Sequence, residues 1–167
     1  MKKLFLALLM LAPIAAFAQS TPKFGHINSQ EVMQAMPEAT QMRTEMEALQ
    51  KQYEADENAM IAEYKKKVED FQAQESTMPD NMKQRKVQEI QEMEQKIQQA
   101  RQDNQQALQK AYADKLTPIQ TKVMDAIKAV GNAGGYVYIM ETNSIPFINT
   151  TLSTDVTAQV KAKLGLK

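Results

Sequence analysis

Few residues in this sequence could carry out catalysis. The 167-residue chain has one histidine, His26, and no cysteine. One histidine can neither share a metal with a second ring nor relay a proton to it, and the chain has no thiol nucleophile. It also has no glycine-rich phosphate-binding motif. His26 lies in a short apolar segment, which favours a structural role. The sequence therefore predicts no enzyme, no catalytic residue, no metal site and no cofactor.

Methionines are the residues best suited to binding a partner. The chain has 12 of them, and many lie on or beside apolar helical stripes. A flexible, polarizable side chain adapts to many surfaces, so exposed methionines are typical of proteins with varied partners. The alternative is that they form the core between two helices, which suits Met42, Met46, Met60 and Met93. Our candidate partner-binding residues are Met33, Met36, Met78 and Met82.

One long polar stretch, Glu38–Lys115, must position several of these side chains. It contains one proline, Pro79, and no glycine, and its apolar residues recur every three or four positions. This pattern predicts two amphipathic helices that fold back near Pro79 into an antiparallel hairpin, with Leu49 facing Leu108. A helix of about 45 residues is roughly 65 Å long. The hairpin should therefore project beyond any small body.

Polar residues interrupt the apolar stripe near the middle of the predicted hairpin. The interruptions are Asp56 in the first helix and Arg101 and Asn104 in the second. The same register places Asp56 opposite Arg101, and Tyr53 opposite Asn104. We expect an Asp56–Arg101 ion pair that helps to fix the register. The alternative is that both charges simply point to water.

The first 18 residues have the form of a secretory signal. Lys2 and Lys3 precede a short apolar run, Leu4–Ile14, and residues 16–18 place alanine where an export peptidase reads small side chains. The run is shorter than the ~20 residues of a membrane span. We expect cleavage after Ala18. The remaining chain has 18 basic and 20 acidic residues, and this balance favours no particular charged partner.

The residues that flank the hairpin predict a small mixed body. Lys23–Asn28 is typical of a strand, and Asn28 with Glu31 forms a capping box for a helix. Pro37 should kink or restart that helix. Beyond Pro118 the apolar face becomes denser, which predicts a helix that packs on the body.

The C-terminal segment continues this body. Residues 131–135, rich in glycine, should end the preceding helix. Tyr136–Met140 predicts a buried strand, and Ile145–Ile148 a second one. Thr157 should cap a last helix that ends at Gly165. The fold class is therefore mainly α with a small β body, from which a long antiparallel helical hairpin projects.

Three sets of residues outside the hairpin resemble those of a known family. They are Phe24-Gly25-His26-Ile27-Asn28-Ser29-Gln30-Glu31-Val32 with Met36-Pro37-Glu38; Pro118-Ile119, Val123, Ala126-Ile127, Val130 and Gly135-Tyr136; and Asp155-Val156-Thr157, Val160 and Lys163-Leu164-Gly165. Together with the order of elements, they are similar to the Skp/OmpH family of periplasmic chaperones. The resemblance covers the whole chain after the signal and is most specific at its two ends.

The resemblance implies a soluble periplasmic homotrimer. Strands of three chains would form one β body, and three hairpins would surround a cavity that holds unfolded outer-membrane proteins without ATP. The chain would divide into a signal peptide (1–18), an association domain (19–37 and 116–167) and a hairpin (38–115). Client binding would use the four candidate methionines. Trimer contacts would come from Phe24, Ile27, Tyr136, Val137, Tyr138, Ile139, Phe147 and Ile148.

Other partners are less well supported by the sequence. The best-known members of the family are strongly basic and this chain is not, so we carry over no residues for binding lipopolysaccharide or an anionic membrane. We expect no nucleic-acid binding and no stable membrane insertion. The alternative function is a coiled-coil structural or scaffold protein of the cell envelope that binds no client.

Overall fold

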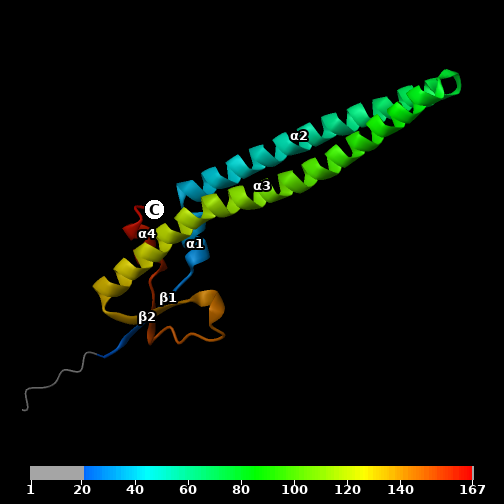
Figure 1. The fold of residues 1–167 in the computed structure, drawn as a ribbon. Coiled ribbons are helices and arrows are strands. Elements are labelled where there is room, and N and C mark those ends of the chain that lie inside the picture. The colour runs from blue at the N-terminus through cyan, green and yellow to red at the C-terminus, as the bar shows by residue number, and fades with distance from the viewer. Residues whose placement is uncertain (1–20, 167) are drawn as a thin grey trace, which may run out of the picture.

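A long pair of helices projects from a small body that contains a three-stranded sheet (Figure 1). The structure is a computed structural model that describes residues 21–166. The predicted signal peptide at 1–18 lies outside the described residues.

The projecting pair consists of α2, Pro37–Gln74, and α3, Asp80–Gly134. They have 38 and 55 residues, because the sequence here is rich in strong helix formers and α2 contains no glycine. A 3-10 turn, η1 (Glu75–Thr77), follows α2, and Pro79 in extended conformation precedes α3. The break therefore lies where the sequence predicts it.

The seam between α2 and α3 is narrow. Met93 and Ile97 of α3 are buried in it, whereas Leu49 and Met60 of α2 are half-buried. A pair of helices shields only one stripe on each, so most of the remaining hairpin surface stays in water. This placement agrees with the interpretation of the hairpin methionines as packing residues.

Helix α3 continues through Pro118 into the body. Proline lacks the N–H that would bond to the carbonyl of Asp114, which ordinarily breaks or kinks a helix. Here the hydroxyl of Thr117 donates to the carbonyl of Ala113 at 2.8 Å, and that of Thr121 donates to the carbonyl of Thr117 at 3.0 Å. Because α3 runs without a break from Asp80 to Gly134, the second arm of the hairpin and the predicted body helix are one continuous element.

Helix α1, Ser29–Gln34, joins the sheet to the hairpin. Asn28 caps it, since its Oδ1 accepts from the N–H of Glu31 at 3.1 Å. The predicted capping box is only half formed, because the N–H of Asn28 donates to Thr157 Oγ1 and the carboxylate of Glu31 accepts from Lys161. The predicted restart at Pro37 is confirmed, since Pro37 is the first residue of α2.

The sheet has the order β2-β1-β3, with both pairings parallel. Its strands are β1 (Lys23–Ile27), β2 (Tyr136–Glu141) and β3 (Ser153–Asp155). The predicted strand at Ile145–Ile148 is wrong: after the 3-10 turn η2 (Thr142–Ser144) this segment is irregular. Pro146 within it has no N–H to donate to a ladder, which disfavours pairing.

Helix α4, Thr157–Lys163, closes the chain, and Gly165 follows it with φ of 72°. The prediction that Thr157 caps this helix is wrong. Thr157 lies inside the first turn, where its N–H donates to Asp155 Oδ1 at 2.8 Å. Its hydroxyl instead accepts from the N–H of Asn28, so it ties α4 to the end of β1.

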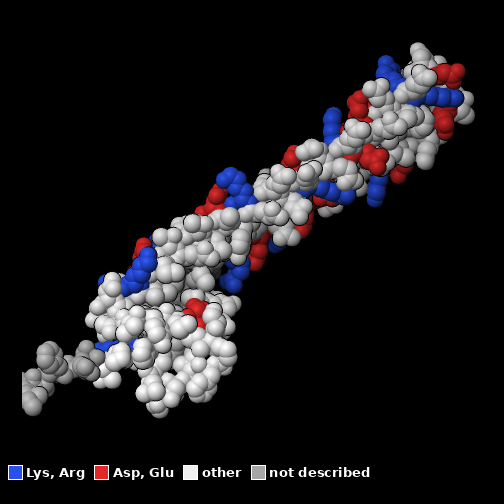
Figure 2. Space-filling view, turned by 60° about the horizontal axis from the view of Figure 1, so that its bottom comes forward, with Lys and Arg blue, Asp and Glu red and all other residues white. Residues whose placement is uncertain are grey.

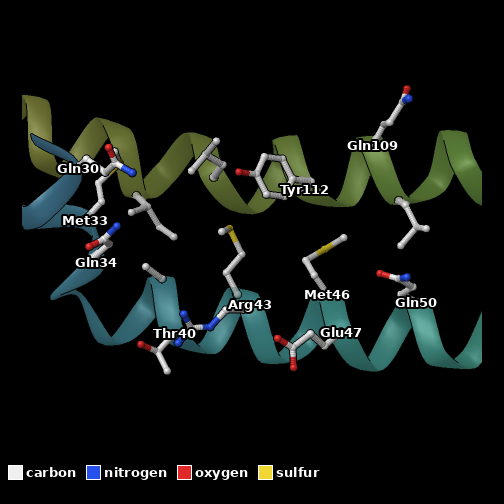
Figure 3. A pocket seen from close by; sticks show the side chains of 15 residues that line it. Gln30, Met33, Gln34, Thr40, Arg43, Met46, Glu47, Gln50, Gln109 and Tyr112 are labelled. Atoms are coloured by element: carbon white, nitrogen blue, oxygen red, sulfur yellow. The ribbon is translucent and has the colours of Figure 1, made fainter. Parts of the chain in front are cut away.

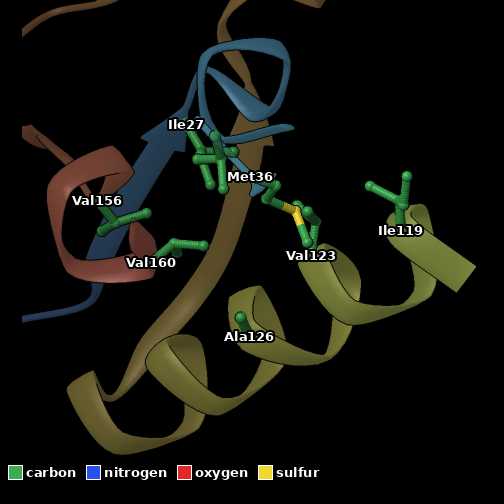
Figure 4. Close-up of a cluster of buried hydrophobic side chains, with 8 residues drawn as sticks. Ile27, Met36, Ile119, Val123, Ala126, Val156 and Val160 are labelled. Carbon is green, nitrogen blue, oxygen red and sulfur yellow. The ribbon is translucent and has the colours of Figure 1, made fainter. Parts of the chain in front are cut away.

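The core of the body gathers side chains from distant parts of the chain. Buried apolar residues from β1, α1, the C-terminal part of α3 and the start of α4 meet there (Figure 4). They are Ile27, Val32, Met36, Ile119, Val123, Ala126, Val156 and Val160. Eight mostly small side chains form a modest core.

Candidate functional site

The sheet carries a continuous apolar surface, which we call the sheet patch. Its residues line one shallow hollow: Phe24, Tyr138, Met140, Ile145, Phe147, Ile148 and Leu152. The rings of Phe24 and Tyr138 stack with centroids 4.9 Å apart. Phe147 is 79% exposed and Leu152 71% exposed. Figure 2 shows charged side chains along the whole hairpin and few on the visible face of the body.

The sheet also has an open edge. Within residues 21–166, β2 pairs only with β1, so its outer backbone groups face no strand of the same chain. An open edge beside exposed aromatic side chains is typical of a surface that another chain covers. The sheet patch and the β2 edge together form the strongest candidate for an association surface.

The predicted trimer contacts fall into two groups in this structure. Val137, Tyr138 and Phe147 are exposed, and Phe24 and Ile148 are half-buried. The remaining three turn toward the chain's own core: Ile27 belongs to it, and Tyr136 and Ile139 pack against it. The expectation that Tyr136–Met140 is buried on both faces therefore needs correction, since Val137, Tyr138 and Met140 are exposed in the single chain.

His26 has the surroundings of a structural residue. It is buried in β1, and its Nδ1 lies 2.9 Å from Ser153 Oγ of the neighbouring strand β3. Asp155, also in β3, is desolvated by partial burial, which raises its pKa. Hydrogen bonds from Thr157, together with the electrostatic effect of the nearby His26, outweigh this and lower the pKa of Asp155 below its ordinary value of 3.8. The contact between His26 and Ser153 holds β3 against β1.

A long groove, which we call the hairpin groove, runs along the base of the hairpin. Residues of α1, α2 and α3 line its volume of about 880 Å³. Met46 of α2 and Tyr112 of α3 face one another across it (Figure 3). The sequence pattern does not predict this groove. The apolar spacing of α3 includes Tyr112. Nothing in the pattern, however, indicates that a groove opens between α2 and α3 near α1.

The four candidate methionines lie in different environments. Met33 is half-buried and lines the hairpin groove. Met78 is half-buried at the tip and Met82 is exposed there. Met36 is only 2% exposed and belongs to the body core. Because Pro37 ends the first helical segment there, the Met36 side chain turns inward, and it is not available as a binding residue.

Ion pairs join the two hairpin helices. Lys122 Nζ lies 2.7 Å from Glu38 Oε1, Lys115 pairs with Glu45, and Arg101 Nε lies 2.6 Å from Glu57 Oε1. The predicted partner of Arg101 was Asp56, and this is corrected by one position. Glu57 is half-buried beside the seam, whereas the shorter side chain of Asp56 is exposed. Tyr53 and Asn104 are half-buried at the same level.

These ion pairs should make the base of the hairpin sensitive to acid. The hydrogen bond from Lys122 lowers the pKa of Glu38 below 4.5, and that from Lys115 does the same for Glu45. Their contribution to stability is therefore present above pH 4.5 and is lost as pH falls through the lowered values. Melting temperatures of the wild type and of Glu38→Gln/Glu45→Gln should differ at pH 7, and the difference should shrink as the pH falls below 4.5. Glu69→Gln, an exposed change on α2, serves as control, and an unchanged difference at pH 3 would contradict the prediction.

The fold and surfaces described above define a class of protein: a small sheet-containing body that carries a long helical hairpin and leaves an apolar face open. The profile of the outer membrane protein (OmpH-like) family matches residues 23–164. The chain belongs to the OmpH-like family.

One solved structure shows the same fold over most of both chains. It is the crystal structure of a candidate OmpH-like outer membrane chaperone from Caulobacter crescentus CB15. The two sequences are 14% identical, the TM-score is 0.75, and the match covers 87% of this chain and 85% of the other. No curated protein sequence matches this chain.

Membrane-spanning helices are not found in the described part of the chain. Although α2 and α3 are long enough, neither has a sufficiently apolar window.

Proposed function

We propose that the protein is an ATP-independent holdase chaperone that keeps unfolded outer-membrane proteins soluble in the periplasm. Membership of the OmpH-like family and the fold shared with the Caulobacter protein support this role. The observation that carries the proposal is the combination of a long hairpin with an uncovered apolar face on the body. A holdase needs surfaces that accept apolar segments without closing on them, which the long hairpin would provide. The apolar face of the body would join several hairpins around one client.

Three copies of the chain would associate through the body. The sheet patch and the β2 edge would be covered by neighbouring copies, with Val137, Tyr138 and Phe147 at the contact. A modest core of small side chains supports this arrangement, because association would bury additional apolar area. Residues 19–37 and 116–167 would then form the association domain, and residues 38–115 of each copy would form one wall of a client cavity. Residues 1–18 would direct export.

The test of this function is a dilution experiment. A denatured outer-membrane barrel protein is diluted into buffer without nucleotide, and its aggregation is followed by light scattering. We expect the wild-type protein to suppress the scattering in proportion to its concentration. Full scattering at a threefold molar excess of this protein, as with an inert coiled-coil protein, would overturn the proposed function.

Polar substitutions at the hairpin tip should weaken client holding. Met78 and Met82 present partly accessible apolar area there. If each contributes about 0.5 kcal/mol to client contact, Met78→Gln/Met82→Gln should weaken holding about fivefold. The concentration needed for half-maximal suppression of scattering measures this effect. Ser76→Gln, at the same tip, should leave it unchanged. Equal protection by all three proteins would exclude a role for the tip methionines.

A further inference from the structure

The hairpin groove has two rows of apolar side chains, and their spacing along the helices is close to the spacing of alternate side chains in an extended chain. Met42 and Met46 lie on α2, and Leu108, Tyr112 and Leu116 lie on α3. Residues four apart on a helix rise by about 6 Å, which is close to the ~6.7 Å between alternate side chains of an extended chain. An extended segment lying along the groove could therefore place every second side chain beside one of these rows.

The groove has the length and volume of a short peptide site. Its lining on α2 runs from Ala39 to Gln50, a rise of about 16 Å, or roughly five residues of extended chain. Its volume of about 880 Å³ lies within the range of roughly 300–1,000 Å³ that is usual for ligand sites. Tyr112 remains 49% exposed, and the other four residues of the two rows are half-buried, so the apolar lining is partly open to a partner.

The polar side chains of the groove can form hydrogen bonds with the backbone of a bound extended segment. Gln30 and Gln34 of α1 and Gln50 of α2 also line the groove. A carboxamide both donates and accepts hydrogen bonds, so it can satisfy the N–H and C=O groups of an extended segment whatever its sequence. Arg43 and Glu47 contribute one charge of each sign. The groove is therefore complementary to a segment without net charge.

We propose that the hairpin groove binds a segment of about five extended residues in which apolar and polar side chains alternate. Strands of membrane barrels have this pattern, with apolar side chains on one face only. The apolar face would lie against the two rows and the polar face would stay in water, so a barrel strand is bound without its partners. This inference rests on the proposed holdase function and names the form in which the client is held.

Peptide binding tests the inference directly. The probe is a fluorescein-labelled peptide of seven residues in which leucine alternates with threonine, and its Kd is measured by fluorescence anisotropy. Met46→Gln/Tyr112→Gln should weaken binding about tenfold, because both apolar rows lose contact area while glutamine keeps helix propensity. Met124→Gln changes an exposed methionine of α3 outside the groove and should leave Kd unchanged. A peptide of the same composition with contiguous leucines should bind at least tenfold more weakly.

The outcomes separate this inference from the proposed function. If the wild type protects a barrel protein but Met46→Gln/Tyr112→Gln binds the alternating peptide equally well, the groove proposal alone is overturned. Equal binding of the two peptides overturns the claim that the groove binds an extended segment with alternating side chains. If Met46→Gln/Tyr112→Gln forms an assembly of lower molecular mass than the wild type, the groove is a contact between copies and the proposal also fails. If the groove binds the peptide as expected and the wild type does not protect a barrel protein, the holdase function alone fails.

Discussion

Replacing Ile27 with alanine should lower the free energy of unfolding by about 2–5 kcal/mol. Ile27 is 2% exposed and lies at the end of the central strand β1, where side chains from α1 and α4 surround it. Truncation removes buried methyl and methylene groups and leaves a cavity that a rigid strand cannot close. In a body with few large buried side chains, this is a major part of the total stability.

The measurement is urea unfolding followed by circular dichroism. Because association would couple stability to concentration, wild type and variant are compared at one protomer concentration. Val87→Ala, at a partly exposed position of α3, is the matched control and should change the free energy by less than about 0.5 kcal/mol. A loss below 1 kcal/mol for Ile27→Ala would mean that β1 is not packed as the structure places it.

The sequence predicted the hairpin well because its signals are local. Gaps of three and four between apolar residues define a helix, and the only proline between Glu38 and Lys115 marks the turn at residue 79. Gly135 adopts φ of 67°, a conformation that glycine reaches without strain, so the end of α3 was predictable as well. The same local reasoning predicted a separate body helix beyond Pro118, whereas Pro118 lies inside α3. Continuous packing of α3 from the seam to the core outweighs the missing hydrogen bond.

The predicted ion pair of Arg101 was placed one residue away from the observed one, because the local sequence pattern does not distinguish Asp56 from Glu57. Asp56 and Glu57 are both acidic, and both lie near the position where the stripe is interrupted. The half-buried residues Tyr53, Glu57 and Met60 follow the spacing of the seam. Asp56 and Glu57 point in directions about 100° apart around the helix axis, and this direction and the length of the side chain decide which residue reaches Arg101. A two-helix pattern leaves that choice open.

The body was harder to predict because its sheet joins segments that are distant in sequence. The third strand, Ser153–Asp155, has three residues and no apolar run, so its pairing with β1 has no periodic signature. Ile145–Ile148 has the composition of a strand but contributes instead to the sheet patch. Met36 looked like a surface residue because it follows an exposed helical turn. It is buried because α2 restarts at Pro37 in a new direction.

The sheet patch leads to the prediction with the largest effect on assembly: Phe147→Glu should abolish trimer formation. Phe147 is 79% exposed in the single chain, so the change should alter the folding of an isolated protomer by less than about 0.5 kcal/mol. In the proposed trimer the same position is covered, and three carboxylates would be desolvated near one another. Each unpaired buried charge costs several kcal/mol, which is enough to dissociate an assembly of small bodies.

Light scattering coupled to size-exclusion chromatography measures this effect. The wild type should elute with the mass of three chains and Phe147→Glu with the mass of one, while circular dichroism shows the same helix content for both. Val87→Glu adds the same charge on the hairpin and should leave the mass unchanged. Without the trimer there is no enclosed cavity, so Phe147→Glu should also lose most of its protection of a diluted barrel protein. A trimeric Phe147→Glu variant would exclude the sheet patch as the contact, and a wild type with the mass of one chain would overturn the trimer itself.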